Sequence, residues 1–267
     1  HNHMLSDIST RAIKTHLASR DVTHKTKKNY MIPLRGILDH FDINPNPARF
    51  KLPGKHQKKE VDRFSPTERE LILDQLSDDP QIFYALMFGT GMRPSEILAL
   101  TWQDYDGQQM NVSKGIVRRK LKASTKTHER RTVYIPSWVR PYIERLSTRF
   151  DSGHLFLNSK GTPRLDTDRF NEAWREAFDS HTLKRKHKIS YRIPYTSRHT
   201  RAAELLSTGV APGDAAKQLG HTLEMFYRTY SEWIEEFSGK SDLSRFEGTA
   251  PDQSPTKHRL KAGKQNG

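Results

Sequence analysis

Residues 195–233 read YTSRHTRAAELLSTGVAPGDAAKQLGHTLEMFYRTYSEW, and they carry the clearest structural signal in the chain. Apolar residues recur there at helical spacing, interrupted by glycine and proline. The helices predicted from this pattern cover about 196–208, 212–219 and 223–237. Gly220 and His221 close the second of them, and Tyr230 follows His221 by nine residues. This part of the fold is therefore predicted to be helical.

Upstream, the sequence Ser65-Pro66-Thr67-Glu68 marks the start of a domain. It supplies an N-cap, a proline at the first helical position and a glutamate placed to complete a capping box. Further helices are predicted at 66–76, across Ile82–Phe88, from near Pro94, and at about 137–149 and 166–179. Phe170, Trp174 and Phe178 recur every four residues and are assigned to the core.

Residues 109–135 change to a strand-like pattern with polar turns between the apolar positions, which predicts a short antiparallel sheet. Residues 5–53 hold two helical patterns: Ile13 and Leu17 share one face, and a fuller stripe is formed by Tyr30, Leu34, Ile37, Leu38 and Phe41. The predicted fold is therefore mainly α with a small antiparallel β-sheet.

Composition divides the chain into a small and a large domain. The expected segments are an expression-vector remnant at 1–4, a helical domain at 5–53, a basic linker at 54–62, a second domain at 63–238, and a polar basic tail, disordered by composition, at 239–267.

The chain carries 45 Lys and Arg against 31 Asp and Glu, a net charge of +14. Such an excess repels itself in a compact fold and is typical of proteins that bind a polyanion, of which nucleic acid is the natural candidate. No apolar run approaches the roughly 20 residues that span a bilayer. With no cysteine, disulfides, thiolate metal sites and cysteine nucleophiles are excluded.

Several catalytic motifs are missing from the sequence, including His-Glu-x-x-His and the phosphate-binding Gly-x-x-x-x-Gly-Lys loop. What remains is a set of cations with one well-placed tyrosine. Arg93 stands at a predicted helix start, where backbone N–H groups favour an anion. Lys126 lies in a predicted turn between strands, and Arg198 lies in Tyr195-Thr196-Ser197-Arg198.

These blocks resemble the tyrosine recombinases, specifically the phage-type integrases, over roughly residues 5–240. The likeness is strongest in Thr90–Trp102, Tyr195–Gly209 and Gln218–Trp233. Each block alone is a weak signal, but their order and the nine-residue gap from His221 to Tyr230 make a strong one.

The resemblance implies a catalytic role for each matching residue. Arg93 and Arg198 would clamp the non-bridging phosphate oxygens, and His221 would donate a third hydrogen bond. Lys126 would protonate the leaving 5′-hydroxyl. Tyr230 would attack the phosphate and form a 3′-phosphotyrosine. A 5′-hydroxyl from another strand can then attack this ester and release the tyrosine. The reaction would need no metal, nucleotide or other cofactor.

Tyr195 departs from the family pattern, because histidine is more usual at that position. A phenol is a poor proton acceptor at neutral pH, so the sequence does not identify the group that accepts the proton of Tyr230. Tyr195 is still a catalytic candidate, as a residue that binds the phosphate or fixes Arg198.

Other residues near these candidates admit more than one interpretation. Tyr227 is a rival nucleophile on a similar helical face, although the spacing favours Tyr230. His199 is interpreted as a structural residue, and Glu96 either orients Arg93 or acts as a helix-start carboxylate.

Basic residues outside the catalytic set are expected to contact DNA phosphates. Lys120 and Lys122 also compete with Lys126 for the catalytic position on the basic hairpin. The expected DNA-binding residues are Lys25, Lys27, Lys28, Lys55, Lys58, Lys59, Lys120, Lys122, Lys184, Arg185, Lys186, Lys188 and Arg192.

The resemblance further implies a two-domain, C-shaped clamp around double-stranded DNA, acting as a homotetramer on paired attachment sites in the bacterial cytoplasm, with DNA-bending accessory proteins as further partners. Segment 231–238, with Trp233 and Ile234, is expected either to pack on a neighbouring protomer or to pack within its own chain. An N-terminal arm-binding domain of this family is expected to have been removed. The rival function is a non-catalytic DNA-binding accessory or regulatory protein on the same fold; a metal-dependent nuclease is disfavoured because no carboxylate cluster is present.

Overall fold

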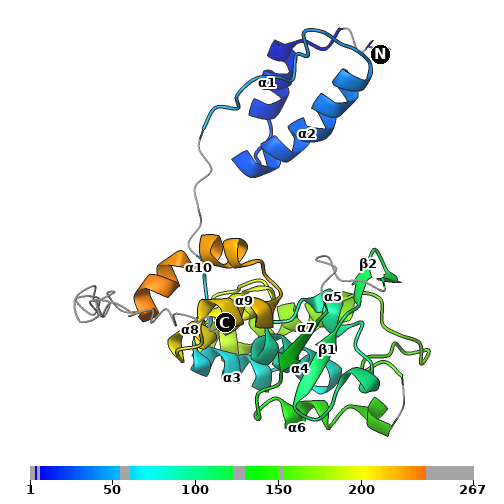
Figure 1. The fold of residues 1–267 in the computed structure, drawn as a ribbon, viewed down its shortest axis with the longest axis vertical. Coiled ribbons are helices and arrows are strands. Elements are labelled where there is room, and N and C mark those ends of the chain that lie inside the picture. The colour runs from blue at the N-terminus through cyan, green and yellow to red at the C-terminus, as the bar shows by residue number, and fades with distance from the viewer. Residues whose placement is uncertain (1–3, 5–6, 55–60, 123–129, 151–152, 239–267) are drawn as a thin grey trace, which may run out of the picture. The chain divides into compact units, whose positions relative to one another are not determined.

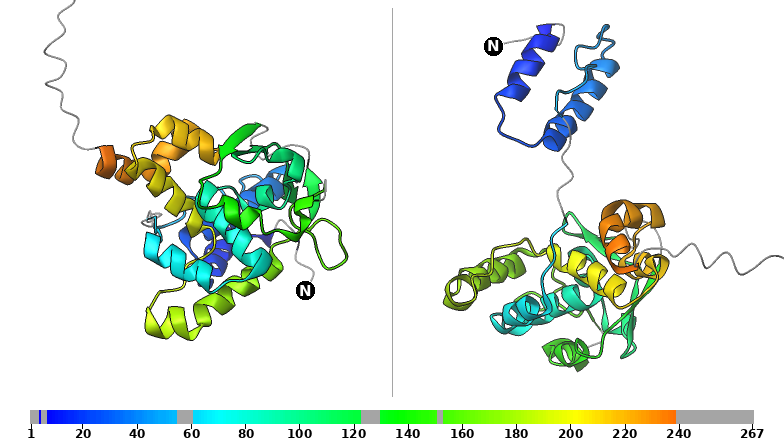
Figure 2. Two further views of the ribbon diagram at one scale, coloured as in Figure 1. Left: turned by 90° about the horizontal axis from the view of Figure 1, so that it is seen from below. Right: turned by 90° about the vertical axis from the view of Figure 1, so that its left-hand side faces the viewer.

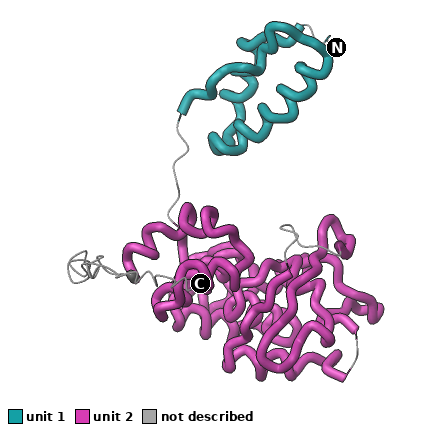
Figure 3. The backbone as a smooth tube through the Cα atoms, in the orientation of Figure 1, with its two compact units in different colours: residues 1–60 teal, residues 61–267 magenta. Residues whose placement is uncertain are grey.

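The computed structural model describes residues 4, 7–54, 61–122, 130–150 and 153–238. The chain separates into two compact units, residues 1–60 and 61–267 (Figure 3). The predicted tail at 239–267 and most of the predicted linker lie outside the described residues.

The smaller unit contains two helices, α1 (Thr10–Ala18) and α2 (His24–His40). Each begins at a hydroxyl N-cap, Ser9 and Thr23 respectively, whose side chain accepts a backbone N–H of the first turn. The core of this unit consists of Ile13, Leu17, Met31, Leu38 and Ala48.

The apolar stripe predicted for the second helix is only partly buried. Leu38 is fully enclosed, whereas Tyr30, Ile37 and Phe41 are 49%, 46% and 58% exposed. Within the described part of this unit, the buried cluster joins Met31 and Leu38 of α2 to α1 and Ala48, and these three side chains lie outside that cluster.

The larger unit is mainly helical (Figures 1 and 2). Its α-helices are α3 (Pro66–Asp74), α4 (Asp78–Thr90), α5 (Pro94–Ile97), α6 (Arg140–Ile143), α7 (Asp168–Asp179), α8 (Thr196–Ser207), α9 (Pro212–Leu219) and α10 (Leu223–Ser238). Short 3-10 turns occur at Trp102–Asp104 and Ser147–Phe150, and a π-helical segment, η4, at His181–Lys186.

The predicted sheet region forms two separate two-stranded antiparallel sheets rather than one. Strand β1 (Gln109–Val112) pairs with β4 (Arg131–Tyr134), and β2 (Gly115–Val117) pairs with β3 (Lys120–Lys122). In β1 only alternate residues, Met110 and Val112, are buried, as expected for a sheet with one face on the core.

Helix α4 forms the centre of the larger unit. Every residue from 82 to 90 is buried, because α3, α6, α7 and α8 all pack around this helix. Phe170, Trp174 and Phe178 of α7 lie in the same core, as predicted. A second cluster joins α8, α9 and α10, which lie side by side (Figures 1 and 2).

Candidate active site

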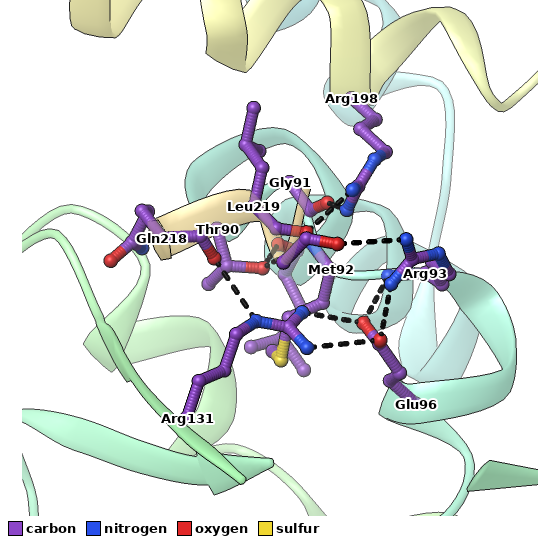
Figure 4. A network of polar contacts seen from close by, with 11 residues as sticks. Thr90, Gly91, Met92, Arg93, Glu96, Arg131, Arg198, Gln218 and Leu219 are labelled. Atoms are coloured by element: carbon purple, nitrogen blue, oxygen red, sulfur yellow. Dashed lines mark hydrogen bonds and ion pairs between the residues drawn. The ribbon is translucent and has the colours of Figure 1, made fainter. Parts of the chain in front are cut away.

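An ion-pair network at the start of α5 fixes two arginines around one carboxylate (Figure 4). Glu96 accepts hydrogen bonds from Arg93 Nη1 at 2.8 Å and from Arg131 Nη1 and Nη2 at 3.0 and 2.7 Å. Glu96 also accepts the Arg93 backbone N–H at 2.8 Å, which caps the helix. The carboxylate thus fills both roles considered from the sequence, because it caps α5 and orients Arg93.

The charge of Glu96 is maintained by these contacts. Its side chain is 3% exposed, and burial by itself raises the pKa of the carboxyl. The hydrogen bonds and charges of Arg131 and Arg93 outweigh this effect and lower the pKa to about 2. At neutral pH one negative charge therefore faces two guanidinium groups, and the network remains cationic.

Replacing Glu96 with glutamine preserves the shape of the side chain and removes its charge. Breaking a buried ion pair in this way costs about 3–5 kcal/mol, so we expect a lower free energy of unfolding at pH 7. Because the folded pKa is depressed from 4.5 to about 2, the wild-type advantage is present above pH 4.5 and disappears as the pH falls towards 2. Urea unfolding of both proteins across this range checks the prediction, and an advantage that persists unchanged near pH 2 contradicts it.

Arg198 lies inside the domain with 0% of its surface exposed. Its two Nη atoms donate to the carbonyl oxygens of Gly91 and Leu219, and so tie α8 to the ends of α4 and α9 (Figure 4). Burial lowers the pKa of the guanidinium to about 10, and the charge of Arg93 acts in the same direction, so Arg198 stays cationic at neutral pH. Among the described residues Nε has no hydrogen-bond partner, which leaves one buried donor unsatisfied.

Two glycines allow the helix ends to approach these arginines. Gly91 follows α4 at φ 67°, and Gly220 follows α9 at φ 65°, the left-handed conformation that favours glycine. A Cβ on Gly91 would lie 2.2 Å from Leu219 Cδ2, and one on Gly220 would lie 2.8 Å from Arg131 Cζ. The Gly220 carbonyl oxygen accepts Arg93 Nη2 at 3.0 Å. Larger residues would separate the groups that meet here.

Tyr230 lies at a kink in α10, where its φ of −119° and ψ of 20° depart from helical values, and it is only 1% exposed. Its ring stacks on Trp233 at a centroid distance of 5.3 Å and contacts Phe226 at 4.9 Å. Burial raises the pKa of the phenol well above its ordinary value, although the charge of Arg198 opposes this. Because Trp233 stacks on Tyr230, it packs within its own chain.

Two histidines flank Tyr230. His199 of α8 places Nδ1 3.0 Å from the Tyr230 hydroxyl oxygen, whereas the ring of His221 lies beside the phenol ring, with centroids 6.1 Å apart and planes at 26°. Burial lowers the pKa of His199 to about 4 and that of His221 to about 3, and the charge of Arg198 adds to both shifts. Both imidazoles are therefore neutral at neutral pH. The rings of Tyr195 and His199 form a T-shaped contact, with their centroids 5.5 Å apart.

The groups gathered here suit phosphate chemistry. Guanidinium forks and imidazole N–H groups match the oxygens of a phosphodiester, and a phenol can attack its phosphorus. Within the described ranges, no three histidine, aspartate or glutamate side chains are grouped as a metal site. Nor is any helix in the described part of the chain long and apolar enough to cross a membrane.

The sequence profile of the phage integrase family matches residues 41–233. The chain belongs to the phage integrase family. The chain is 25% identical over 209 residues to the prophage integrase IntR of Escherichia coli (strain K12), covering 66% of this chain and 49% of IntR. It is 27% identical over 232 residues to a XerC-like tyrosine recombinase of Caldanaerobacter subterraneus, covering 74% and 57% of the two chains. The chain thus spans about half the length of these curated relatives.

Solved structures share the fold of this chain. The Tn1549 transposon integrase in complex with circular intermediate DNA matches with a TM-score of 0.72 and 18% identity, over 92% of this chain and 86% of that one. A lambda integrase dimer bound to a core site matches with a TM-score of 0.66 and 15% identity, over 88% and 67%. The mainly helical fold with small antiparallel sheets is therefore that of the tyrosine recombinases.

The fold brings together four of the residues selected from the sequence. Arg93 reaches the Gly220 carbonyl beside His221, His221 stacks along Tyr230, and the charge of Arg198 acts on both. Lys126 and the linker residues Lys55, Lys58 and Lys59 lie outside the described residues. Those expected DNA-contacting residues that the structure describes as exposed are Lys25, Lys28, Lys120, Lys122, Lys184, Arg185, Lys186 and Lys188; Lys27 is half-buried.

Arg192 does not have the surface position expected of a DNA-binding residue. Its side chain is 15% exposed, pairs with Glu68, donates to the Arg63 carbonyl oxygen at 2.8 Å and lies 4.3 Å from the Phe64 ring centroid. These contacts hold the start of α3 against the core of the larger unit. Much of the basic run that precedes Arg192 is helical, in η4.

Arg131 is a residue of the site that sequence analysis missed. Arg131 pairs with Glu96 across 35 positions, so no local pattern reveals it. His199, expected to be a structural residue, forms its hydrogen bond with Tyr230, the candidate nucleophile. The signal in the sequence was that His199 directly follows Arg198. Consecutive residues of a helix such as α8 point about 100° apart.

Proposed function

We propose that this integrase is a site-specific DNA recombinase that cuts and rejoins strands through a 3′-phosphotyrosine at Tyr230. The observation that carries the proposal is the placement of a phenol among neutral imidazoles and buried cations, at 3.0 Å from His199 Nδ1 and under the charge of Arg198. This combination stabilises an anionic transition state at a phosphate without a bound metal.

Each group has a distinct task in the proposed reaction. Arg93 and Arg198 stabilise the charge that builds on the non-bridging oxygens, and His221 donates a hydrogen bond to the same phosphate. Lys126 supplies the proton to the leaving 5′-oxygen. Arg131 acts through Glu96, which it helps to hold in place beside Arg93.

Tyr230 has to become exposed before it can reach DNA, because it is 1% exposed in the structure. Arg63 contacts the part of α10 that follows Tyr230 and so helps to keep Tyr230 buried. Its guanidinium lies 5.3 Å from the ring centroids of Trp233 and Phe237 and pairs with Glu236 at 3.1 Å. We propose that displacement of this contact accompanies presentation of the nucleophile.

Substituting alanine for Arg63 is expected to loosen α10. Two cation–π contacts at an exposed site contribute about 0.5–1 kcal/mol each, so amide hydrogen exchange in residues 223–237 should accelerate by roughly fivefold or more. Arg149→Ala is the matched control, because Arg149 lies over the exposed Phe150 ring, far along the chain from α10. Equal exchange rates in α10 for the wild type and Arg63→Ala would refute this role.

The proposed architecture places DNA between a core-binding domain at 5–53 and a catalytic domain at 63–238, in a C-shaped clamp. The exposed lysines of α2, β3 and η4 would contact phosphates, and the basic linker would follow the duplex. A homotetramer on two paired sites in the bacterial cytoplasm, assisted by DNA-bending proteins, would complete the recombination complex.

A covalent protein–DNA adduct distinguishes the recombinase from a non-catalytic DNA-binding protein. DNA fragments that bind the protein are selected first, and the selected site is rebuilt as a nicked duplex that loses a short strand after cleavage. Incubation with EDTA followed by denaturing electrophoresis should give a slowly migrating adduct. Tight, site-specific binding without any adduct would favour the accessory-protein function instead.

A further inference from the structure

The attack by Tyr230 requires that its hydroxyl proton be taken up by another group. The family pattern offers a histidine where this chain has Tyr195, so the acceptor must be found elsewhere in the site. We propose that His199 is the general base, and that its Nδ1 accepts the phenolic proton of Tyr230. This inference rests on the proposed recombinase function.

Geometry separates His199 from the other groups around Tyr230. The distance of 3.0 Å from His199 Nδ1 to the hydroxyl oxygen is within hydrogen-bond range for direct proton transfer. His221 instead lies alongside the phenol ring. Tyr195, whose ring meets that of His199 in a T-shaped contact, is a phenol and a poor proton acceptor at neutral pH. Arg198 is cationic and has no proton acceptor.

The protonation state of His199 fits this role. Burial and the charge of Arg198 keep the pKa of its imidazole at about 4, so the ring is neutral and able to accept a proton at physiological pH. The acceptor tautomer carries its hydrogen on Nε2 and leaves the Nδ1 lone pair directed at the Tyr230 hydroxyl. A charged lysine or arginine at this position could not serve as a base.

The fold explains how one helix supplies two different functions. Arg198 and His199 are neighbours on α8, so their side chains leave the helix about 100° apart. Arg198 faces the ends of α4 and α9, whereas His199 faces α10. The cation and the base therefore approach the reacting phosphate region from one rigid element.

The proposed step balances as follows. The Tyr230 oxygen forms a bond to phosphorus while the bond from phosphorus to the 5′-oxygen breaks. The phenolic proton moves to His199 Nδ1 and gives an imidazolium, and the 5′-oxygen receives a separate proton from its general acid, Lys126. In the rejoining step the imidazolium of His199 returns its proton to the departing phenolate.

The test compares the rate of adduct formation by wild-type protein and His199→Asn on the nicked duplex described above. Asparagine places an amide group near the position of Nδ1, so it retains a hydrogen bond to Tyr230 but cannot take up a proton. General-base catalysis contributes about 10²- to 10⁴-fold, and we expect a loss in this range. Rates are compared at saturating protein, with the folded fraction checked by thermal unfolding and with His199→Gln as a second variant.

A second measurement separates a base from a structural residue. A ring-fluorinated tyrosine is introduced at position 230 by codon suppression. Its phenol ionises at lower pH, so its attack depends less on a general base. The loss caused by His199→Asn should then shrink to less than about tenfold. His221→Asn is the comparison: it removes a phosphate donor, so fluorination should leave its loss unchanged.

The outcomes distinguish this inference from the proposed function. If the wild type forms no adduct, the proposed function itself fails. If the wild type forms adduct and His199→Asn forms it at the same rate, or if fluorination leaves the His199→Asn loss undiminished, His199 is not the base and the recombinase proposal stands. A selective rescue of His199→Asn supports the assignment.

Discussion

Tyr230→Phe is expected to abolish the covalent adduct while leaving DNA binding intact. Phenylalanine keeps the ring that packs on Trp233 and Phe226, so the core of α10 is retained. The substitution removes one oxygen, the atom that would attack the phosphate, and with it the hydrogen bond to His199. Electrophoretic mobility shift and denaturing electrophoresis on the same samples measure binding and adduct separately.

Tyr227→Phe provides the matched control from the same helix. Tyr227 is 45% exposed and lies three residues before Tyr230, so it is the more accessible phenol. Its spacing from His221 does not fit the family pattern, and we expect Tyr227→Phe to form the adduct at the wild-type rate. Loss of the adduct in Tyr227→Phe, with retention in Tyr230→Phe, would reverse the assignment of the nucleophile.

Arg198→Lys is the second substitution with a large expected effect. A lysine ammonium cannot donate to the Gly91 and Leu219 carbonyl oxygens with the fixed fork of a guanidinium. Leaving one buried carbonyl unpaired costs about 1–3 kcal/mol, and losing one donor to the transition state lowers the cleavage rate by about 10²- to 10³-fold. Urea unfolding and single-turnover adduct formation measure the two losses.

Arg201, three residues further along α8, separates stability from catalysis. It is half-buried and pairs with Glu204 at 3.3 Å, and the charge of Arg69 in α3 acts on it. Arg201→Lys should therefore lower the free energy of unfolding but leave the adduct rate of folded protein close to wild type. If Arg198→Lys also cleaves at the wild-type rate once folded, its contribution is structural alone.

Local signals in the sequence predicted most helices of the larger unit, but the helix predicted at 137–149 is reduced to the four residues of α6 and a 3-10 turn. The capping box predicted at Ser65 is present, with Glu68 and Ser65 bonded to each other's backbone N–H groups. The helix predicted across Ile82–Phe88 lies within α4, and Gly91, which follows α4, adopts the left-handed conformation typical of a helix end. Such features depend on residues three or four positions apart, which a sequence displays directly.

Features that depend on distant partners could not be predicted. Arg192 looked like a surface cation, but its partner Glu68 lies 124 positions away. The stripe containing Tyr30 and Phe41 looked like a core face, but burial depends on which elements cover α2. Two sheets formed where one was expected, because β1 pairs with the distant β4 rather than with β2.

The candidate site divides in the same way. The residues selected from motifs, Arg93, Arg198, His221 and Tyr230, do lie in one cluster. The contacts that orient them could not be read from the sequence: Arg131 of β4 bonds to Glu96 of α5, and His199 reaches Tyr230 across 31 positions. Family motifs identify which side chains matter, whereas the fold decides what orients them and where their protons go.

The most direct test of the account is to identify the residue that carries the DNA. Trypsin cleaves after Lys217, Arg228 and Lys240, so Tyr227 and Tyr230 fall in different peptides, 218–228 and 229–240. The wild-type adduct is digested with nuclease and trypsin, and the peptides are sequenced by mass spectrometry. The account predicts a nucleotide phosphate on peptide 229–240, at Tyr230. A modified peptide 218–228, or one that contains Tyr195, would contradict it.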